Sequence, residues 1–240
     1  MSNMVRLDKF LSEMGVGTRS EVKKILKSKQ VTVNGDTVIK PETKIDTDND
    51  VVCYKGTQIS YQKYEYYMFN KPAGCVSATE DNLHRTVMDY ITDVVHDDLF
   101  PVGRLDIDTE GLLLITNDGA LAHELLSPAK HVAKTYYARI DGMVTEDDVN
   151  RFKNGVDIGE DKLTKPGKLV VLKSEPISEI ELTITEGKFH QVKRMFEAVG
   201  KKVIYLKRIS MGSLELPDDL ALGEYRALTQ VELDGLNRNV

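Results

Sequence analysis

The sequence has few of the residues that build metal centres or disulfide frameworks. Its two cysteines, Cys53 and Cys75, stand alone, without the paired spacing of a zinc site or the density of a secreted disulfide-rich domain. The five histidines show neither His-x-x-x-His spacing nor paired carboxylates. They are His84, His96, His123, His131 and His190. We therefore expect both cysteines to have a packing role, and we expect no metal ion and no cofactor.

Long apolar segments are also missing. The longest, such as residues 111–116, have the length of a strand and not of a membrane-spanning helix. No apolar run follows a basic leader at the N-terminus, as it would in a signal peptide. With 41% hydrophobic and 29% charged residues, the composition is that of an ordinary folded protein. These features predict a cytoplasmic protein with no membrane association.

The charged residues are unevenly distributed. The formal net charge of -6 at first argues against a nucleic-acid partner, because phosphate binding depends largely on lysine and arginine. Residues 1–30, however, contain seven basic and three acidic side chains, a net charge of +4. Residues 141–161 contain seven acidic side chains, which we interpret as a solvated face kept away from phosphate. A basic end on an acidic body suggests a docking module.

The basic segment has the pattern of a small folded module that occupies residues 1–60. Apolar residues recur at helical spacing over residues 7–14, and glycines end the run. Thr18 and Glu21 have capping-box spacing at the start of a second helix. The Asn34-Gly35 pair lies between two short strand-like runs, which predicts a β-hairpin.

This order of helix, capped basic helix and hairpin resembles the S4 RNA-binding domain. The resemblance is carried by Arg6-Leu-Asp-Lys-Phe-Leu, Thr18-Arg-Ser and Val31-Thr-Val-Asn-Gly. It implies that basic side chains of the module contact RNA. The candidates are Arg6, Arg19, Lys23, Lys24 and Lys27. Charge alone favours a small helical cap with a solvated lysine face.

Residues 61–240 predict a second, larger domain of the α+β class. Strands are expected over residues 66–69, 112–116, 180–185 and 203–209, from their apolar or alternating patterns. One helix is expected over residues 120–126, capped by the preceding turn. A later helix is expected to bury Phe189, Val192, Phe196 and Val199 on one face, with Lys193 beside that face. This mixed order fits an α+β domain better than a doubly wound parallel sheet.

A loop just before the strand at residues 112–116 concentrates polar residues. It contains Arg104 and the carboxylates Asp106 and Asp108 between two glycines. Loops at strand edges often carry function, although carboxylates two residues apart are poorly arranged to flank a glycosidic bond. From the residues alone, an ordinary surface turn explains this loop better than a catalytic site does.

The segment Gly103-Arg-Leu-Asp-Ile-Asp-Thr-Glu-Gly-Leu-Leu-Leu-Ile-Thr-Asn-Asp-Gly119 resembles the central motif of the pseudouridine synthases. Further similar segments are Asn70-Lys-Pro-x-Gly74, Lys134-Thr-Tyr136, Gly187-Lys-Phe-His-Gln-Val-Lys-Arg-Met-Phe196 and Gly223-Glu-Tyr-Arg226. The resemblance implies a mixed, mainly antiparallel catalytic sheet and an isomerase that converts uridine in RNA to pseudouridine.

The same resemblance assigns roles to individual residues. It implies that Asp106 is the nucleophile and that Lys193, or else Arg194, is its basic partner. It implies that Tyr136 stacks on the uracil and takes the C5 proton, whereas without the motif a core tyrosine is the favoured interpretation. Arg104 is a candidate to fill the gap left by the flipped base. His190 is a candidate either for an RNA contact or for a structural hydrogen bond, and Arg194 is a further candidate for an RNA contact.

The expected substrate is small-subunit (16S) ribosomal RNA. Phe189-His-Gln-Val-Lys-Arg and Leu163-Thr-Lys-Pro166 are more similar to the small-subunit, RsuA-type enzymes than to the large-subunit enzymes. The alternatives are a large-subunit (23S) pseudouridine synthase, a noncatalytic RNA-binding assembly factor, and another nucleoside-directed enzyme such as an RNA glycosidase. We expect a monomer whose substrate is the RNA itself or an assembly particle that includes ribosomal proteins.

Overall fold

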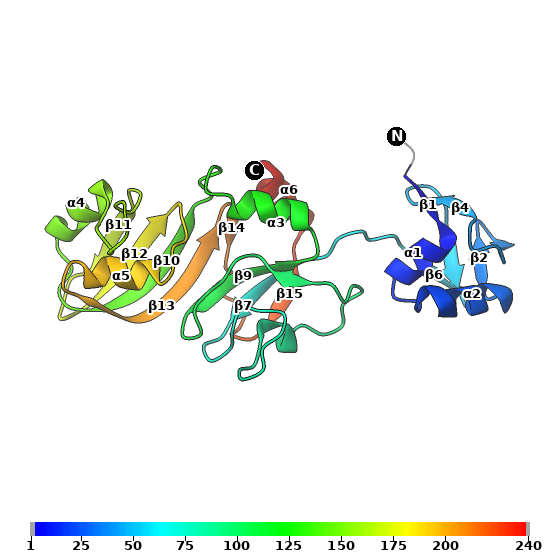
Figure 1. Cartoon of the computed structure of the whole chain (residues 1–240), viewed down its shortest axis with the longest axis horizontal. Coiled ribbons are helices and arrows are strands. Elements are labelled where there is room, and N and C mark those ends of the chain that lie inside the picture. Colours follow the sequence, from blue (N-terminus) through cyan, green and yellow to red (C-terminus); the bar gives the residue numbers. More distant parts are fainter. Residues whose placement is uncertain (1–2, 239–240) are drawn as a thin grey trace. The chain divides into compact units, whose positions relative to one another are not determined.

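The structure, a computed structural model, describes residues 3–238 (Figure 1). The chain forms two compact units. The first comprises the described residues up to Glu65 together with Asp93–Asp98, and the second comprises Tyr66–Thr92 and the described residues from Leu99 onward. The segment Asp93–Asp98, which lies within the sequence of the larger unit, packs with the smaller one, where the Glu65 carboxylate accepts hydrogen bonds from the amides of Val95 and His96.

The N-terminal unit consists of two helices and short antiparallel strands. Its elements are β1 (Met4–Arg6), α1 (Leu7–Glu13), α2 (Arg19–Lys27), β2 (Val31–Val33), β3 (Asp36–Thr37), β4 (Lys44–Asp46), β5 (Val52–Tyr54) and β6 (Thr57–Ile59). Strand β1 pairs with β4, and a four-stranded sheet has the order β3-β2-β5-β6. Its core includes Phe10 and Leu11 from α1 and Val22 and Leu26 from α2.

Two local predictions for this unit are confirmed. Helix α2 begins with a capping box, in which the Thr18 hydroxyl accepts from the Glu21 amide and the Glu21 carboxylate accepts from the Thr18 amide. The β2–β3 hairpin turns at Asn34 and Gly35, both of which have positive φ, at 53° and 88°. Asparagine and glycine tolerate this left-handed conformation, which matches the twist of a two-residue hairpin.

The larger unit is built on a nine-stranded sheet. Seven strands follow the order β11-β12-β10-β13-β9-β7-β15, and the two short strands β14 and β8 pair with β13 and β9. The strands are β7 (Tyr66–Lys71), β8 (Phe100–Pro101), β9 (Glu110–Thr116), β10 (Lys134–Asp141), β11 (Lys168–Lys173), β12 (Ile177–Ile184), β13 (Lys202–Met211), β14 (Leu214–Glu215) and β15 (Tyr225–Ala227). The β13–β9 pair is parallel, and the other pairs among the described strands are antiparallel. The predicted α+β class with a mixed, mainly antiparallel sheet is therefore confirmed.

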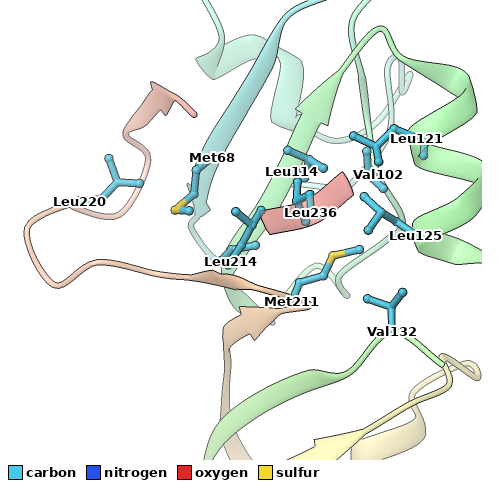
Figure 2. Packing of buried hydrophobic residues seen from close by; sticks show 12 residues of the cluster. Met68, Val102, Leu114, Leu121, Leu125, Val132, Met211, Leu214, Leu220 and Leu236 are labelled. Atoms are coloured by element: carbon cyan, nitrogen blue, oxygen red, sulfur yellow. The ribbon is translucent and has the colours of Figure 1, made fainter. Parts of the chain in front are cut away.

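The larger unit has the 3₁₀ helix η1 (Val87–Tyr90) and the α-helices α3 (Gly119–Leu126), α4 (Glu146–Asn154), α5 (Gln191–Glu197) and α6 (Gln230–Arg238). The α-helices lie beside the sheet in two groups (Figure 1). Helices α4 and α5 lie beside β11 and β13, whereas α3 and α6 lie near β9 and β14. In Figure 2, Leu121 and Leu125 of α3 and Leu236 of α6 meet Leu114 of β9 in one apolar cluster. As predicted, α3 is capped at its N-terminus, where the Asp118 carboxylate accepts two backbone hydrogen bonds.

The prediction that Phe189 lies on a buried helix face is wrong. Helix α5 begins only at Gln191, and Phe189 precedes it with 74% of its surface exposed. His190 adopts the left-handed conformation, with φ 48° and ψ 35°, so the helix cannot extend back through it. Val192 and Phe196 are buried on one face of the helix, as the apolar pattern predicts.

The acidic segment at residues 141–161 is only partly the solvated face that its charge suggested. Asp148 is buried. Its carboxylate accepts a hydrogen bond from the Thr145 amide at the start of α4 and forms an ion pair with Lys201 Nζ at 2.8 Å. Glu160 is exposed but forms ion pairs with two basic side chains near α5. The remaining acidic residues of the segment are exposed.

The two cysteines are free thiols. Cys75 is fully buried and Cys53 is half-buried, as their predicted packing role requires. Within residues 3–238, none of the helices combines the length and the apolar character that crossing a membrane would require.

Candidate active site

The polar loop at residues 103–109 lies at the centre of the sheet, directly before β9. Gly111 of β9 faces Arg208 of β13 in the parallel pair. At Gly111, φ is 102°, and an added Cβ atom would lie 2.2 Å from the Arg208 carbonyl oxygen. Glycine is therefore required where the two strands approach each other. This close approach holds the end of the loop against β13.

A buried lysine holds the middle of the loop. The Lys71 side chain is fully buried at the end of β7, and its Nζ donates to the carbonyl oxygens of Asp106 at 3.1 Å, Thr109 at 2.9 Å and Pro72 at 3.0 Å. Burial lowers the pKa of Lys71. In addition, the Ser77 hydroxyl hydrogen-bonds both the amide and the carbonyl of Leu105. Lys71 belongs to the Asn-Lys-Pro motif, yet sequence reasoning gave it no role, because its partners are backbone carbonyls far along the chain.

The Asp106 carboxylate is paired with Lys193 of α5. Lys193 Nζ lies 2.9 Å from Asp106 Oδ2 and 2.6 Å from Asp108 Oδ1, so one ammonium group bridges two carboxylates. Partial burial acts to lower the pKa of Lys193, but the hydrogen bonds to Asp108 and Asp106 outweigh it and raise the pKa. Although burial opposes it, the bond from Lys193 lowers the pKa of Asp108. His190 Nε2 lies 3.6 Å from Asp106 Oδ1.

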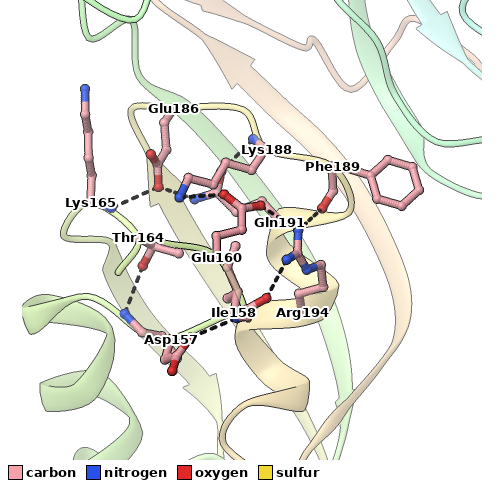
Figure 3. Close-up of polar contacts among 12 residues, drawn as sticks. Asp157, Ile158, Glu160, Thr164, Lys165, Glu186, Lys188, Phe189, Gln191 and Arg194 are labelled. Carbon is pink, nitrogen blue, oxygen red and sulfur yellow. Dashed lines mark hydrogen bonds and ion pairs between the residues drawn. The ribbon is translucent and has the colours of Figure 1, made fainter. Parts of the chain in front are cut away.

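Arg194 is the other basic residue considered as a partner of Asp106. Its side chain makes a different set of contacts (Figure 3). Its guanidinium donates to Glu160 Oε1 at 2.8 Å, to the Phe189 carbonyl at 3.1 Å and to the Ile158 carbonyl. These bonds tie the segment before α5 to the loop around residue 160. Arg194 therefore holds the backbone around the site together, and Lys193 is the residue in contact with Asp106.

Tyr136 lies on the buried face of β10 and is 8% exposed. Its register partner on β13 is Arg208, which is also buried. Arg208 Nε donates to the Leu112 carbonyl at 2.7 Å, whereas its Nη2 atom is buried without a hydrogen-bond partner in the described residues. Lys134 lies on the same face of β10, and burial together with the Arg208 charge lowers its pKa to about 8. Sequence reasoning missed Arg208, since a single arginine in an apolar strand has no motif of its own.

The remaining sequence candidates for RNA contact are exposed. Arg104 lies on the surface of the loop two residues before Asp106. Arg6 is exposed and forms an ion pair with Asp8 at 2.8 Å. Helix α2, which begins with the Thr18–Glu21 capping box, carries four basic residues whose side chains are exposed to solvent. They are Arg19, Lys23, Lys24 and Lys27.

Comparison with known proteins agrees with these motifs. The family model described as RNA pseudouridylate synthase matches residues 65–198, and that of the S4 domain matches residues 5–52. The chain is 46% identical to the uncharacterized RNA pseudouridine synthase YtzG of Bacillus subtilis (strain 168), covering 97% of this chain and 98% of that protein. It is 40% identical to ribosomal small subunit pseudouridine synthase A of Escherichia coli (strain K12), covering 95% and 98%.

A solved structure extends the likeness to the fold. A crystal structure of a pseudouridylate synthase superposes with a TM-score of 0.68 at 37% sequence identity, covering 97% of this chain and 99% of that one. The matches include both the polar loop at residues 103–109 and the basic N-terminal unit. The chain therefore belongs to the RNA pseudouridylate synthase family of isomerases and carries an S4 domain ahead of its catalytic domain.

Proposed function

We propose that this protein converts one uridine of small-subunit (16S) ribosomal RNA to pseudouridine, with Asp106 as the nucleophile. The observation that carries this proposal is the contact of 2.9 Å between Asp106 Oδ2 and Lys193 Nζ, on a loop held by Lys71 and by Gly111. A carboxylate with a fixed orientation and a neutralising partner is suited to covalent attack.

The reaction needs few chemical groups. The bond between ribose C1′ and uracil N1 breaks, the base turns, and C1′ joins C5. C5 then loses its proton, and N1 takes up a proton. Atoms balance without any oxidant or reductant, and the product has the mass of the substrate. The Asp106 carboxylate serves equally for attack on C1′ or for addition to the uracil ring. Lys193 balances the carboxylate charge in both cases.

Tyr136 and Arg104 complete the proposed machinery. Tyr136 stacks on the uracil and accepts the C5 proton, a role supported by its buried position on β10 next to the charged Arg208. Arg104, exposed two residues before the nucleophile, fills the space that the target base leaves in the RNA. Lysine at position 193 supplies a compact point charge, unlike the rigid fork of an arginine.

The small-subunit assignment is supported by the relatives. Escherichia coli (strain K12) and Yersinia pestis have proteins 40% and 42% identical to this chain, and both carry the name ribosomal small subunit pseudouridine synthase A. The proposed substrate is the RNA or an assembly particle with ribosomal proteins, which a monomer acts on in the cytoplasm. The second candidate is a large-subunit (23S) substrate for the same chemistry.

The test is incubation of the purified protein with unmodified small-subunit and large-subunit ribosomal RNA, followed by carbodiimide mapping of pseudouridine. We expect one new site in small-subunit RNA with the wild type and none with Asp106→Asn. Asp147→Asn, which removes an exposed carboxylate of α4, is the matched control and should retain full activity.

Each other outcome has a defined meaning. A site only in large-subunit RNA keeps the chemistry and overturns the substrate. Full activity of Asp106→Asn removes Asp106 from the mechanism. RNA binding without product, on free RNA and on assembly particles alike, favours a noncatalytic assembly factor, and release of free uracil favours an RNA glycosidase.

A further inference from the structure

Phe189 is exposed to solvent although it is a large apolar residue. All six phenylalanines lie in the described part of the chain; four are buried and Phe100 is partly buried, whereas 74% of Phe189 is exposed. In Figure 3 its ring points away from the surrounding polar residues. Exposing an aromatic ring sacrifices the free energy that burial would provide, so such a ring often marks a binding surface.

One face of the Phe189 ring is already covered by the next residue. The rings of Phe189 and His190 are stacked, with centroids 3.8 Å apart and an interplanar angle of 18°. His190 has a left-handed backbone, which is uncommon for residues other than glycine, although histidine is among the residues that adopt it more often. Phe189 and His190 thus form a two-ring stack, and most of Phe189 remains exposed.

Polar contacts hold the backbone that carries the stack. The Phe189 carbonyl accepts from Arg194 Nη1 at 3.1 Å, and Arg194 is paired with Glu160 (Figure 3). The Lys188 amide donates to the Gln191 side chain at 2.9 Å, and Lys188 Nζ also pairs with Glu160. A platform fixed in advance loses little conformational entropy when a ligand binds.

The stack also lies beside the nucleophile, because His190 Nε2 is 3.6 Å from Asp106 Oδ1. An enzyme that acts on a base must take it out of the RNA stack, which leaves the neighbouring base with an uncovered face. Aromatic side chains next to the catalytic group replace that lost stacking, and they do so for any base because every base has a π face.

We propose that Phe189 and His190 form a stacking platform for the nucleobase directly next to the target uridine, with Phe189 in contact with that base. The proposal rests on the proposed function, because it takes the substrate to be RNA whose uridine enters the Asp106 site. The platform holds the flanking base while the target is extracted, and it tolerates different bases in that position.

The test is a double-mutant cycle between Phe189 and the RNA. Wild type, Phe189→Ala and Phe189→Tyr are compared on a small-subunit RNA fragment that contains the mapped uridine, and on two fragments with an abasic nucleotide on its 5′ or 3′ side. Val231→Ala, which truncates another exposed apolar residue, is the matched control. Circular dichroism checks that each variant is folded.

On intact RNA we expect kcat/KM of Phe189→Ala to fall about tenfold, and that of Phe189→Tyr and Val231→Ala to stay within about twofold of wild type. On one of the abasic fragments, Phe189→Ala and wild type should be equal. Wild-type activity in Phe189→Ala, or an undiminished loss on both abasic fragments, overturns the platform and leaves the proposed function standing. A wild type that makes no pseudouridine in any RNA overturns both.

Discussion

Lys193 serves two carboxylates with one ammonium group. Asp106 is the less exposed of the two, with a side chain 26% exposed against 66% for Asp108. Because the more exposed ion pair is better screened by water, Lys193 matters most for Asp106. The bridge leaves the three side chains with a formal net charge of -1.

Replacing Lys193 by methionine should therefore lower kcat by about 10- to 100-fold, the loss expected for one charge-assisted hydrogen bond. Lys193→Arg retains the charge and should keep most of this activity. Single-turnover formation of pseudouridine on the mapped fragment measures both. Equal activity of Lys193→Met and wild type would show that the ion pair plays no part in the reaction.

At the scale of elements, the position of the loop at residues 103–109 depends on how closely β9 approaches β13. An added methyl group at Gly111 would meet the backbone of Arg208, which cannot move away as a flexible side chain could. The positive φ of 102° adds backbone strain for any residue with a Cβ atom. Both effects act on the one parallel pair among the described strands.

We expect Gly111→Ala to reduce the free energy of unfolding by about 3 kcal/mol or more. Gly119→Ala is the control, because Gly119 is the first residue of α3 and a Cβ atom there meets nothing within 4 Å. That change should be neutral or stabilising, by up to about 1 kcal/mol. Urea unfolding followed by circular dichroism compares the two, and similar stabilities would contradict the required close approach.

A second contact between elements anchors α6 through charge. The Arg226 guanidinium donates to both Glu232 carboxylate oxygens, at 2.7 and 2.9 Å, and the Thr229 amide donates to the same carboxylate. The hydrogen bond from Arg226 is the main reason that the pKa of Glu232 is lowered to about 2. The unfolded chain takes up this proton near pH 4.5, whereas the folded chain does so only near pH 2.

Glu232 therefore stabilises the fold fully above about pH 4.5, and its contribution is lost as the pH falls toward about 2. We expect Glu232→Gln to be less stable than wild type at neutral pH, by about 1 to 3 kcal/mol, and the difference to shrink in acid. Thermal melting at neutral pH and at about pH 3 measures this. A difference that does not change with pH would contradict the charged anchor.

At the scale of the whole molecule, stability in alkaline solution should report on the buried Lys134. Its pKa falls from an ordinary value of 10.5 to about 8 because burial, aided by the charge of Arg208, disfavours the protonated form. Between these values the unfolded chain keeps a proton that the folded chain has released, so stability rises with pH in this window. Above about pH 10, Tyr61, whose pKa is raised to about 12 by burial, acts in the opposite direction.

The difference in stability between wild type and Lys134→Met isolates the lysine. Below about pH 8 the variant should be the more stable protein, and wild type should gain on it as the pH rises toward 10, by an amount on the order of 3 kcal/mol. Urea unfolding across this range tests the expectation, with Lys168→Met on exposed β11 as the control. An unchanged difference would show that Lys134 does not titrate with folding.

The S4 domain should contribute to RNA affinity mainly through the exposed lysines of α2. Changing Lys23, Lys24 and Lys27 together to glutamine should weaken binding most at low salt and reduce the slope of log K against log salt by about 2. The same change at Lys40, Lys44 and Lys55, which are exposed elsewhere in this unit, should have a smaller effect. Equal slopes for both variants would indicate a nonspecific charge effect in place of docking by α2.

Local features of this protein were determined by the sequence alone. The Thr18 and Glu21 capping box, the Asn34-Gly35 turn and the Asp118 cap involve residues within a few positions of each other, so their geometry follows from local sterics and hydrogen bonding. The motif around Asp106 likewise identified the family, because its residue types and spacing are specific.

Tertiary structure decided which side chains meet. Lys193 and Asp108 are 85 positions apart, and their contact depends on where α5 and β9 lie along the sheet. For the same reason the partners of Lys71 and the separate contacts of Arg194 could not be read from spacing. Helical periodicity also placed Phe189 wrongly on a buried helix face. The helix begins only after the left-handed His190, whereas the apolar pattern already begins at Phe189. Sequence determined the chemistry this chain carries, and the packing of distant elements determined how that chemistry is arranged.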